Sequence, residues 1–292
     1  MERWRANIGL IVVTVIWGST FVVVKNTLNL VSPIVLVTNR FLAASLALGT
    51  VYLILKPERM KTPVIRDGIL TGMILVGGFV TQTIGLTTTE AGKTSFITGL
   101  NVVMVPIFSV FLLRKLPDRS AVTGVILATV GLGFLTLDTT LHFAPGDLWV
   151  LACAVFFALH IIVTDRLSPR HELMAYTMVQ MVTVTVVSFC MALILGYPEL
   201  LPPLPALPAL LYLGVVATGL VYGLQTWAQR HTTATHTALI FVLEPVFAAA
   251  FAVLLAGENL SGKEWFGGLL ILLGMVISEV RWERSPQTQP AG

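Results

Sequence analysis

Long apolar stretches recur along the whole chain, separated by short polar or proline-containing segments. Each stretch is about 20 residues long and carries few or no charges, which is the length an α-helix needs to cross about 30 Å of hydrocarbon. The pattern predicts ten such helices, over residues 6–26, 33–55, 67–87, 92–113, 120–138, 147–166, 173–195, 208–228, 235–256 and 262–280. The expected fold class is therefore an all-α integral membrane protein with ten transmembrane helices.

The composition supports this prediction. Of the 292 residues, 55% are hydrophobic and only 11% are charged, against about 25% charged residues in an ordinary soluble domain. The first stretch is too long for the apolar region of a signal peptide and lacks a cleavage site, so we expect a retained helix. Cys153 and Cys190 both lie inside predicted helices, where they act as small apolar side chains. We therefore expect no disulfide, metal site or cofactor.

The distribution of Lys and Arg predicts the orientation in the membrane. One set of helix ends carries fourteen basic residues, whereas the opposite set carries only Lys93 and Lys263. Basic residues in short loops are retained on the cytoplasmic side. Both termini are therefore predicted to be cytoplasmic in a multi-pass protein of the inner (plasma) membrane. The net charge of +3 reports this topology, and no nucleic-acid partner is expected.

An internal repeat accounts for the even number of predicted helices. Pro106 in the fourth helix matches Pro245 in the ninth, and the pair Gly124 and Gly131 matches Gly267 and Gly274. Two halves, residues 1–140 and 141–292, would each contain five helices. Because five is odd, the second half must enter the membrane from the opposite face. Such inverted repeats are typical of secondary transporters with a midplane site.

Four segments carry a family resemblance: WGSTFVVVK (17–25), NRFLAASLAL (39–48), GDLWVLACAVFFALH (146–160) and LEPVFAAAFAVLLAGENLSGKEWFGGLLILLGMVI (243–277). The chain resembles an EamA-type member of the drug/metabolite transporter superfamily over about residues 7–280. It departs from the pattern at Arg114-Lys115-Leu116, where a Gly-Glu pair like Gly257-Glu258 would follow the fourth helix. The resemblance implies two five-helix repeats that export small metabolites, often amino acids or related amphiphiles. Substrate, direction and energy source stay open.

Glu244 is the first candidate site residue, because an ionised carboxylate at membrane depth is costly unless it faces protein or a polar cavity. Small side chains at 248, 252 and 256 share its helix face and allow another helix to approach closely. The matching face of the fourth helix carries Asn101. These two faces are predicted to border a central cavity, with Pro106 and Pro245 as hinges. Alternatively, Glu244 is a protonated or paired packing residue.

Arg40 is the candidate partner of Glu244. Counting 1.5 Å per residue from the same membrane surface places Arg40 at about 10 Å depth and Glu244 at about 18 Å, which an extended arginine can span. A carboxylate beside this cation would stay ionised, whereas an unpaired one can carry a proton. A substrate amino or carboxyl group could compete for either residue. The alternative is that Arg40 binds a helix end or extends to the surface.

Four further residues are candidates for the cavity wall, and each has a packing alternative. Trp17 could form an aromatic wall beside Gly18, and His160 could have a proton-linked role. Gln82 and Tyr222 could line the cavity or form interhelical hydrogen bonds. The remaining polar positions are interpreted structurally: Gln225 and Gln229 as interfacial, Lys25 as an anchor reaching outward, and Glu258 as a helix-end residue.

Other classes of function are weighed against a carrier. No H-E-x-x-H, G-x-S-x-G, Gly-rich phosphate loop or paired intramembrane aspartate occurs in the chain, so an enzyme is not expected. A channel would call for a repeated ring of filter residues, which the sequence does not supply. The alternative function is a facilitator or channel-like uniporter of small solutes. The expected partners are a small-molecule substrate and membrane lipids, with proton coupling as a candidate energy source. The sequence does not decide between monomer and homodimer.

Overall fold

The structure, a computed structural model, describes residues 2–55, 62–113, 117–136, 144–197, 200–256 and 261–279. All regular secondary structure within these ranges is helical, as expected from the sequence. The helices of the first half are α1 (Glu2–Gly18), α2 (Thr20–Thr27), α3 (Pro33–Leu55), α4 (Thr62–Thr88), α5 (Ala91–Gly99), α6 (Asn101–Leu113) and α7 (Arg119–Thr136). The residues 114–116 and 257–260, which include Glu258, lie outside the described ranges.

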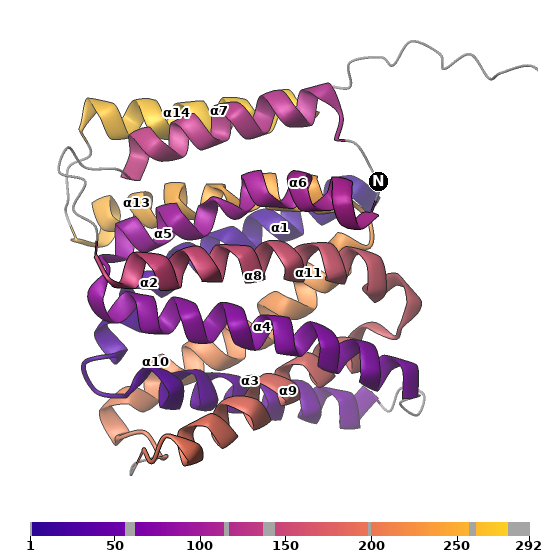
Figure 1. Cartoon of the computed structure of the whole chain (residues 1–292), viewed down its shortest axis with the longest axis vertical. Helices are drawn as coiled ribbons and strands as arrows, with labels where there is room; N and C mark the ends of the chain where they lie inside the picture. The colour runs from indigo at the N-terminus through magenta and orange to yellow at the C-terminus, as the bar shows by residue number, and fades with distance from the viewer. Residues whose placement is uncertain are drawn as a thin grey trace, which may run out of the picture.

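The second half begins with α8 (Gly146–Leu167) and ends with α14 (Gly262–Glu279). Between them lie η1 (Ser168–Arg170), α9 (Leu173–Ile194), η2 (Leu204–Ala206), α10 (Leu207–Leu211), η3 (Tyr212–Leu220), α11 (Val221–Gln229), α12 (Ala234–Phe241) and α13 (Leu243–Ala256). The helices lie across the long axis of the molecule, stacked from α7 and α14 at one end to α3, α9 and α10 at the other (Figure 1).

The described helices are those of a multi-pass membrane protein. Eight segments are long and apolar enough to cross a membrane: 2–27, 33–55, 62–88, 91–112, 146–170, 173–194, 204–229 and 234–251. Residues 119–135 form a shorter apolar helix. Large apolar side chains are exposed on the outside of these helices, as expected of a surface that faces lipid. Phe111 and Ile194, for example, are 78% and 83% exposed. The total of ten spans stays a prediction.

Three predicted helices are interrupted near their middle. The breaks lie at Ser19 between α1 and α2, at Leu100 between α5 and α6, and at Val242 between α12 and α13. The last break has a local cause, because Pro245 has no N–H to donate to the carbonyl four residues earlier. Pro245 then lies in the first turn of α13, where a missing N–H costs little. The first, fourth and ninth predicted spans are therefore each made of two helices.

The eighth predicted helix is also irregular, because η3 is a π-helix. Its wider turn is visible in the hydroxyl of Thr218, which donates to the carbonyl of Leu213 at 2.7 Å, five residues back. Gly214 packs directly against the backbone of α3 at Arg40. π-Helical turns release backbone carbonyls from the regular ladder and occur frequently at functional sites.

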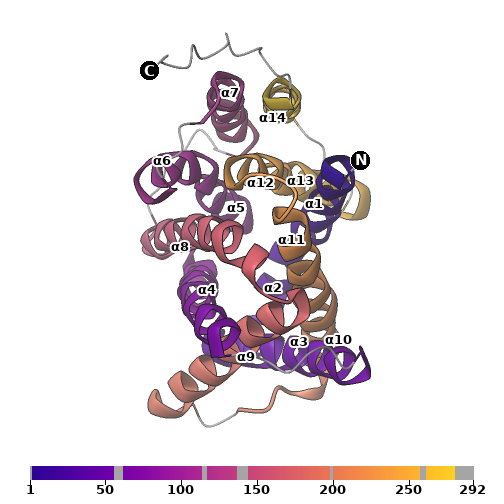
Figure 2. The same ribbon diagram turned by 90° about the vertical axis from the view of Figure 1, so that its right-hand side faces the viewer.

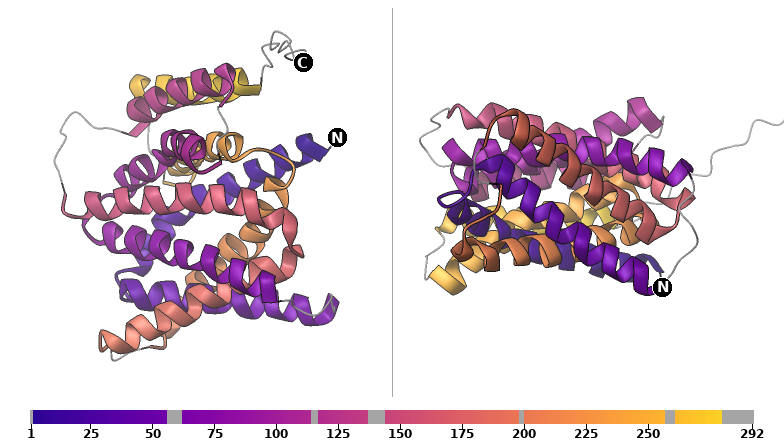
Figure 3. Two further views of the ribbon diagram at one scale, coloured as in Figure 1. Left: turned by 45° about the vertical axis from the view of Figure 1, so that its right-hand side comes forward. Right: turned by 90° about the horizontal axis from the view of Figure 1, so that it is seen from below.

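Helices α7 and α14 form a separate pair at one end of the molecule (Figures 1 and 2), and the same pair is outermost in the view turned by 45° (Figure 3). Glycines bring their backbones into contact. A Cβ on Gly124 would lie 2.6 Å from the carbonyl oxygen of Gly274, and a Cβ on Gly131 would lie 2.6 Å from that of Gly267. The contact is reciprocal, since each glycine also meets its partner from the other side.

This contact yields a matched pair of predictions. In Gly267→Ala the new methyl group meets backbone atoms of Leu135 and Gly131, so we expect the apparent melting temperature of the purified protein to fall by about 5 °C. The neighbouring Gly268→Ala is the control, because nothing lies within 4 Å of a Cβ there. Thermal unfolding followed by tryptophan fluorescence measures both. Equal melting temperatures for the two variants would contradict this packing.

Candidate functional site

One buried pocket collects all seven side chains that the sequence singled out. Trp17, Arg40, Gln82, Asn101, His160, Tyr222 and Glu244 all line it, each from a different helix. The cavity volume is about 40 Å³, which holds a few waters at about 10–15 Å³ each. Any larger ligand therefore requires side chains or helices to move.

Arg40 is buried in α3 and bound by neutral groups. Its Nε donates to the Thr218 hydroxyl at 2.7 Å, and its Nη2 donates to the Ala217 carbonyl at 3.4 Å. The guanidinium carbon lies 4.6 Å from the centre of the Phe79 ring, at cation–π distance. Both hydrogen-bond acceptors belong to the π-helix η3, whose wider turn presents them. Arg40 therefore binds acceptors within a helix, whereas the alternative drawn from the sequence was a helix end or the membrane surface.

Glu244 lies across the pocket from Arg40 in the first turn of α13. In the described part of the chain the Glu244 carboxyl group makes no hydrogen bond or ion pair. The predicted direct Arg40–Glu244 contact is therefore wrong in this conformation, because Thr218 and Ala217 already hold the guanidinium. As expected from the small side chains, α13 approaches α1 closely, and a Cβ on Gly18 would lie 3.0 Å from the amide nitrogen of Ala248.

Aromatic rings form the apolar wall of the pocket. The Trp17 ring lies 5.5 Å from that of Tyr222 and 5.1 Å from that of Phe241. Phe79 continues the wall, with its ring 5.4 Å from that of Phe157. The indole N–H of Trp17 donates to the Ala217 carbonyl at 3.0 Å. The same carbonyl therefore accepts hydrogen bonds from both Trp17 and Arg40. A ligand with an apolar or flat portion fits such a wall.

The remaining polar side chains differ in how well they are satisfied. His160 Nε2 lies 2.9 Å from the Gln180 Oε1, and Gln82 donates to the Thr98 hydroxyl at 3.4 Å. In contrast, the Asn101 Oδ1 is buried and has no hydrogen-bond partner among the residues that the structure describes. A buried unsatisfied acceptor costs free energy unless water or a ligand binds it. Asn101 therefore offers an open acceptor to a ligand in the pocket.

Comparison with known proteins shows which family this chain belongs to. The model of the EamA-like transporter family matches residues 4–137 and again residues 144–279. The chain belongs to the EamA-like transporter family. An "uncharacterized transporter" of Archaeoglobus fulgidus is 33% identical over 281 residues, covering 96% of this chain and 88% of that protein. A "probable amino-acid metabolite efflux pump" of Salmonella typhimurium is 27% identical, covering 95% of each chain. The resemblance inferred from the sequence is confirmed.

A crystal structure with the same fold extends this comparison. It superposes with a TM-score of 0.78 and covers 94% of this chain and 97% of its own, at 19% sequence identity. At that identity the likeness concerns the fold alone.

Sequence reasoning misplaced several polar residues of this EamA-like transporter. Gln225 and Gln229 are not interfacial but only 1% exposed. Gln225 lines the pocket and donates to Gln229, which in turn donates to the Ile161 carbonyl. Lys25 does not reach outward, because its Nζ donates to the Leu86 and Thr89 carbonyls at the end of α4. Cations bind the free carbonyls at helix C-termini, a use that helical periodicity alone does not distinguish from anchoring.

Some pocket residues were missed altogether. In the sequence, Phe79, Phe157 and Phe241 are ordinary apolar residues of their helices. Nothing in the neighbouring residues indicates that these three rings lie in one pocket. Thr98 lies three residues before Asn101 in the same predicted helix but was not a candidate site residue. The aromatic residues could have been found from the repeat only if a ring stood at matching positions of both halves.

Proposed function

We propose that this EamA-like transporter is a secondary-active carrier that exports small metabolites, such as amino acids or related amphiphilic compounds, by alternating access around the central pocket. The observation that carries the proposal is that two buried ionisable side chains of opposite type, Arg40 and Glu244, line one small aromatic-walled pocket. Buried charges in a membrane protein mark substrate or ion pathways by default.

The pocket chemistry favours a substrate with both charges and an apolar part. The guanidinium of Arg40 would hold a carboxylate through charge-assisted hydrogen bonds. Glu244 and the unpartnered Asn101 Oδ1 would receive an ammonium group, and the rings of Trp17 and Tyr222 would cover the side chain. The name of the Salmonella relative, an amino-acid metabolite efflux pump, is consistent with this substrate class.

The proposed architecture is ten transmembrane helices in two inverted five-helix repeats, residues 1–140 and 141–292. Two successive family matches support it. So does the α7–α14 contact, in which Gly124 meets Gly274 and Gly131 meets Gly267. If Gly124 corresponds to Gly267 and Gly131 to Gly274, a pseudo-two-fold axis exchanges one contact with the other. The termini would both be cytoplasmic in the inner membrane.

The proposed motion is a rocking of the two repeats about the pocket. The helix breaks at Leu100 and Val242 lie within about two turns of Pro106 and Pro245 in the sequence. Helices loosened at these points can bend without breaking regular hydrogen bonds. Glu244 would carry the proton if export is driven by a pH gradient.

Transport of a defined panel in proteoliposomes tests the proposal. Purified protein is supplied with radiolabelled amino acids and amphiphilic amines, with and without a pH gradient. We expect saturable uptake of at least one zwitterionic solute and accelerated counterflow by the same solute inside. Flux that rises linearly with concentration and shows no counterflow would favour the channel-like alternative. Absence of flux for every zwitterion on the panel would reject the substrate class.

A further inference from the structure

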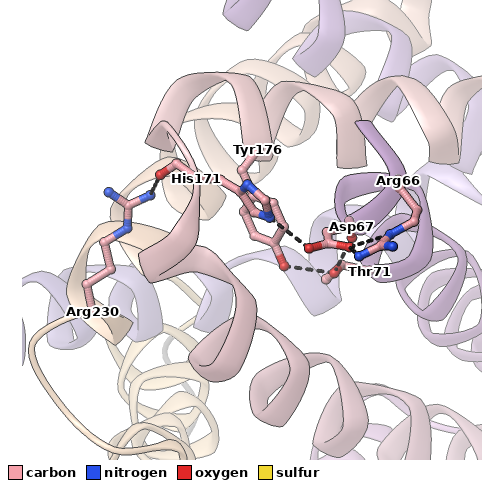
Figure 4. A network of polar contacts seen from close by, with 6 residues as sticks. All are labelled: Arg66, Asp67, Thr71, His171, Tyr176 and Arg230. Carbon is pink, nitrogen blue, oxygen red and sulfur yellow. Dashed lines mark hydrogen bonds and ion pairs between the residues drawn. The ribbon is translucent and has the colours of Figure 1, made fainter. Parts of the chain in front are cut away.

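Figure 4 shows a second group of polar residues, none of which lines the pocket: Arg66, Asp67, Thr71, His171, Tyr176 and Arg230. His171, in the turn between α8 and α9, places its Nε2 2.8 Å from the Asp67 Oδ2 of α4. The two side chains are only 7% and 8% exposed. The contact joins the two halves of the chain across a sequence distance of 104 residues.

Neighbouring groups hold this ion pair in place. The ring of His171 stacks on that of Tyr176 at 5.7 Å, and the Tyr176 hydroxyl lies 2.7 Å from that of Thr71. Thr71 donates to the backbone carbonyl of Asp67. Arg230, at the end of α11, donates to the His171 carbonyl at 2.8 Å. Four elements, namely α4, the α8–α9 turn, α9 and α11, are therefore fastened together at one end.

Buried polar side chains lie between this cluster and the pocket. His160 of the pocket contacts Gln180, whose amide donates to the backbone carbonyl of Tyr176, four residues back in the same helix, at 3.3 Å. Gln180 and Thr164, the latter beside the Tyr176 hydroxyl, are both 0% exposed. We call His160, Gln180, Thr164 and Tyr176 the polar seam. Polar side chains between helices are costly at membrane depth, and they are commonly found where a solute or an ion passes or where they fix the packing of the helices. This seam runs from the pocket to the Asp67–His171 pair.

The opposite end of α4 is closed by a different ion pair. Lys93 of α5 bonds to the Asp147 Oδ2 at the start of α8, and the Thr89 hydroxyl donates to Asp147 at 3.0 Å. Beneath it Gly85 and Gly146 bring the backbones of α4 and α8 into direct contact. Both ends are thus tied, in agreement with the small pocket volume. Among the described residues, a histidine takes part in the tie at the Asp67 end and not in the contacts of Asp147 with Lys93 and Thr89 at the other.

We infer that the Asp67–His171 ion pair is a latch that closes the polar seam between the central pocket and the end of the molecule bearing Arg66, Arg170 and Arg230. This inference rests on the proposed transport pathway. The latch must separate for the pocket to open at that end, which the distribution of basic residues predicts to be cytoplasmic.

Cysteine accessibility tests the latch without requiring a known substrate. In full-length protein with Cys153→Ser and Cys190→Ser, a reporter is placed in the seam as Thr164→Cys. Its rate of reaction with a cationic methanethiosulfonate is measured in nanodiscs. The control reporter is Thr94→Cys in α5, equally buried at 0% exposure but outside the seam. Dividing one rate by the other removes any effect on thiol reactivity that the two positions share.

We expect Asp67→Asn or His171→Gln to raise the rate ratio about tenfold, since a buried bond to a charged group is lost. The exchanged pair Asp67→His/His171→Asp should restore slow labelling, which a misfolded protein would not. An unchanged ratio in both single variants, or an equal rise at the control position, would overturn the latch.

The outcomes separate this inference from the proposed function. If no solute of the panel is transported while the latch variants still open the seam, the substrate class fails and the latch stands. If saturable flux is found while seam labelling ignores Asp67 and His171, the latch fails and the carrier stands.

Discussion

Arg40→Gln is expected to lower the transport efficiency for a zwitterionic solute by about a hundredfold. The guanidinium is 3% exposed and fixed by Thr218, Ala217 and the Phe79 ring. It is therefore already oriented, and substrate binding costs little reorganisation there. Removing it leaves a substrate carboxylate without a counter-charge in a low-dielectric pocket. Initial rates of uptake at several solute concentrations in proteoliposomes measure the loss.

The control for this result is Arg119→Gln, because Arg119 lies exposed at the start of α7 and outside the pocket. Its removal should leave transport within about twofold of the parent, as surface charges contribute little. Arg40→Lys adds a finer test, since lysine keeps the charge but loses the fixed fork of donors. We expect it to recover only part of the loss. Full activity in Arg40→Gln, with normal folding by circular dichroism, would remove Arg40 from the site.

Glu244→Gln is expected to abolish solute flux driven by a pH gradient while sparing solute exchange. Glutamine has nearly the same shape and still receives hydrogen bonds, but it cannot release or bind a proton. In solute exchange the carrier reorients with solute bound in both directions, so no proton is needed. Net export driven by a pH gradient requires the carrier to bind and release a proton. A tenfold or greater difference between the two assays is expected in this variant, measured in the same liposome preparation with a fluorescent pH indicator inside.

Two comparisons sharpen the result for Glu244. Asn101→Ala removes the neighbouring acceptor without touching the titratable group, so it should weaken solute binding in both assays alike. Glu172→Gln replaces a carboxylate that lies at the start of α9 and binds its amides, and it should leave pH coupling intact. Should Glu244→Gln retain its full response to the pH gradient, the proton would have to travel by another group.

A site residue could be predicted from the sequence when its own side chain and its position in a helix were informative, without knowledge of its contacts. The seven pocket residues were found because a polar or bulky aromatic side chain at membrane depth has few acceptable environments. The repeat added Asn101, since its helix matches that of Glu244. Phe79 gave no such signal, because a phenylalanine is equally stable against lipid, core or ligand. Only its contact with Arg40 distinguishes it.

The partners of these residues were less predictable than the residues themselves. Arg40 was expected to reach Glu244, but it binds Thr218 and Ala217, which lie 178 and 177 residues away in the chain. These acceptors are presented by a π-helical segment, and hydrophobic periodicity does not distinguish a π-turn from an α-turn over nine residues. The pair Asp67–His171 was missed for a related reason. Each residue lies near a predicted helix end, where a polar side chain needs no explanation.

The sequence by itself determined that this chain lies in a membrane, where its helices run, which family it resembles and which side chains cannot face lipid. These properties follow from transfer free energies that act residue by residue and from the fixed rise of a helix. The tertiary structure decided how the charges are partnered, where the helices break and which end of the pocket is held by a histidine. Those outcomes depend on contacts between segments distant in the chain, where several acceptors compete for one donor and packing selects among them.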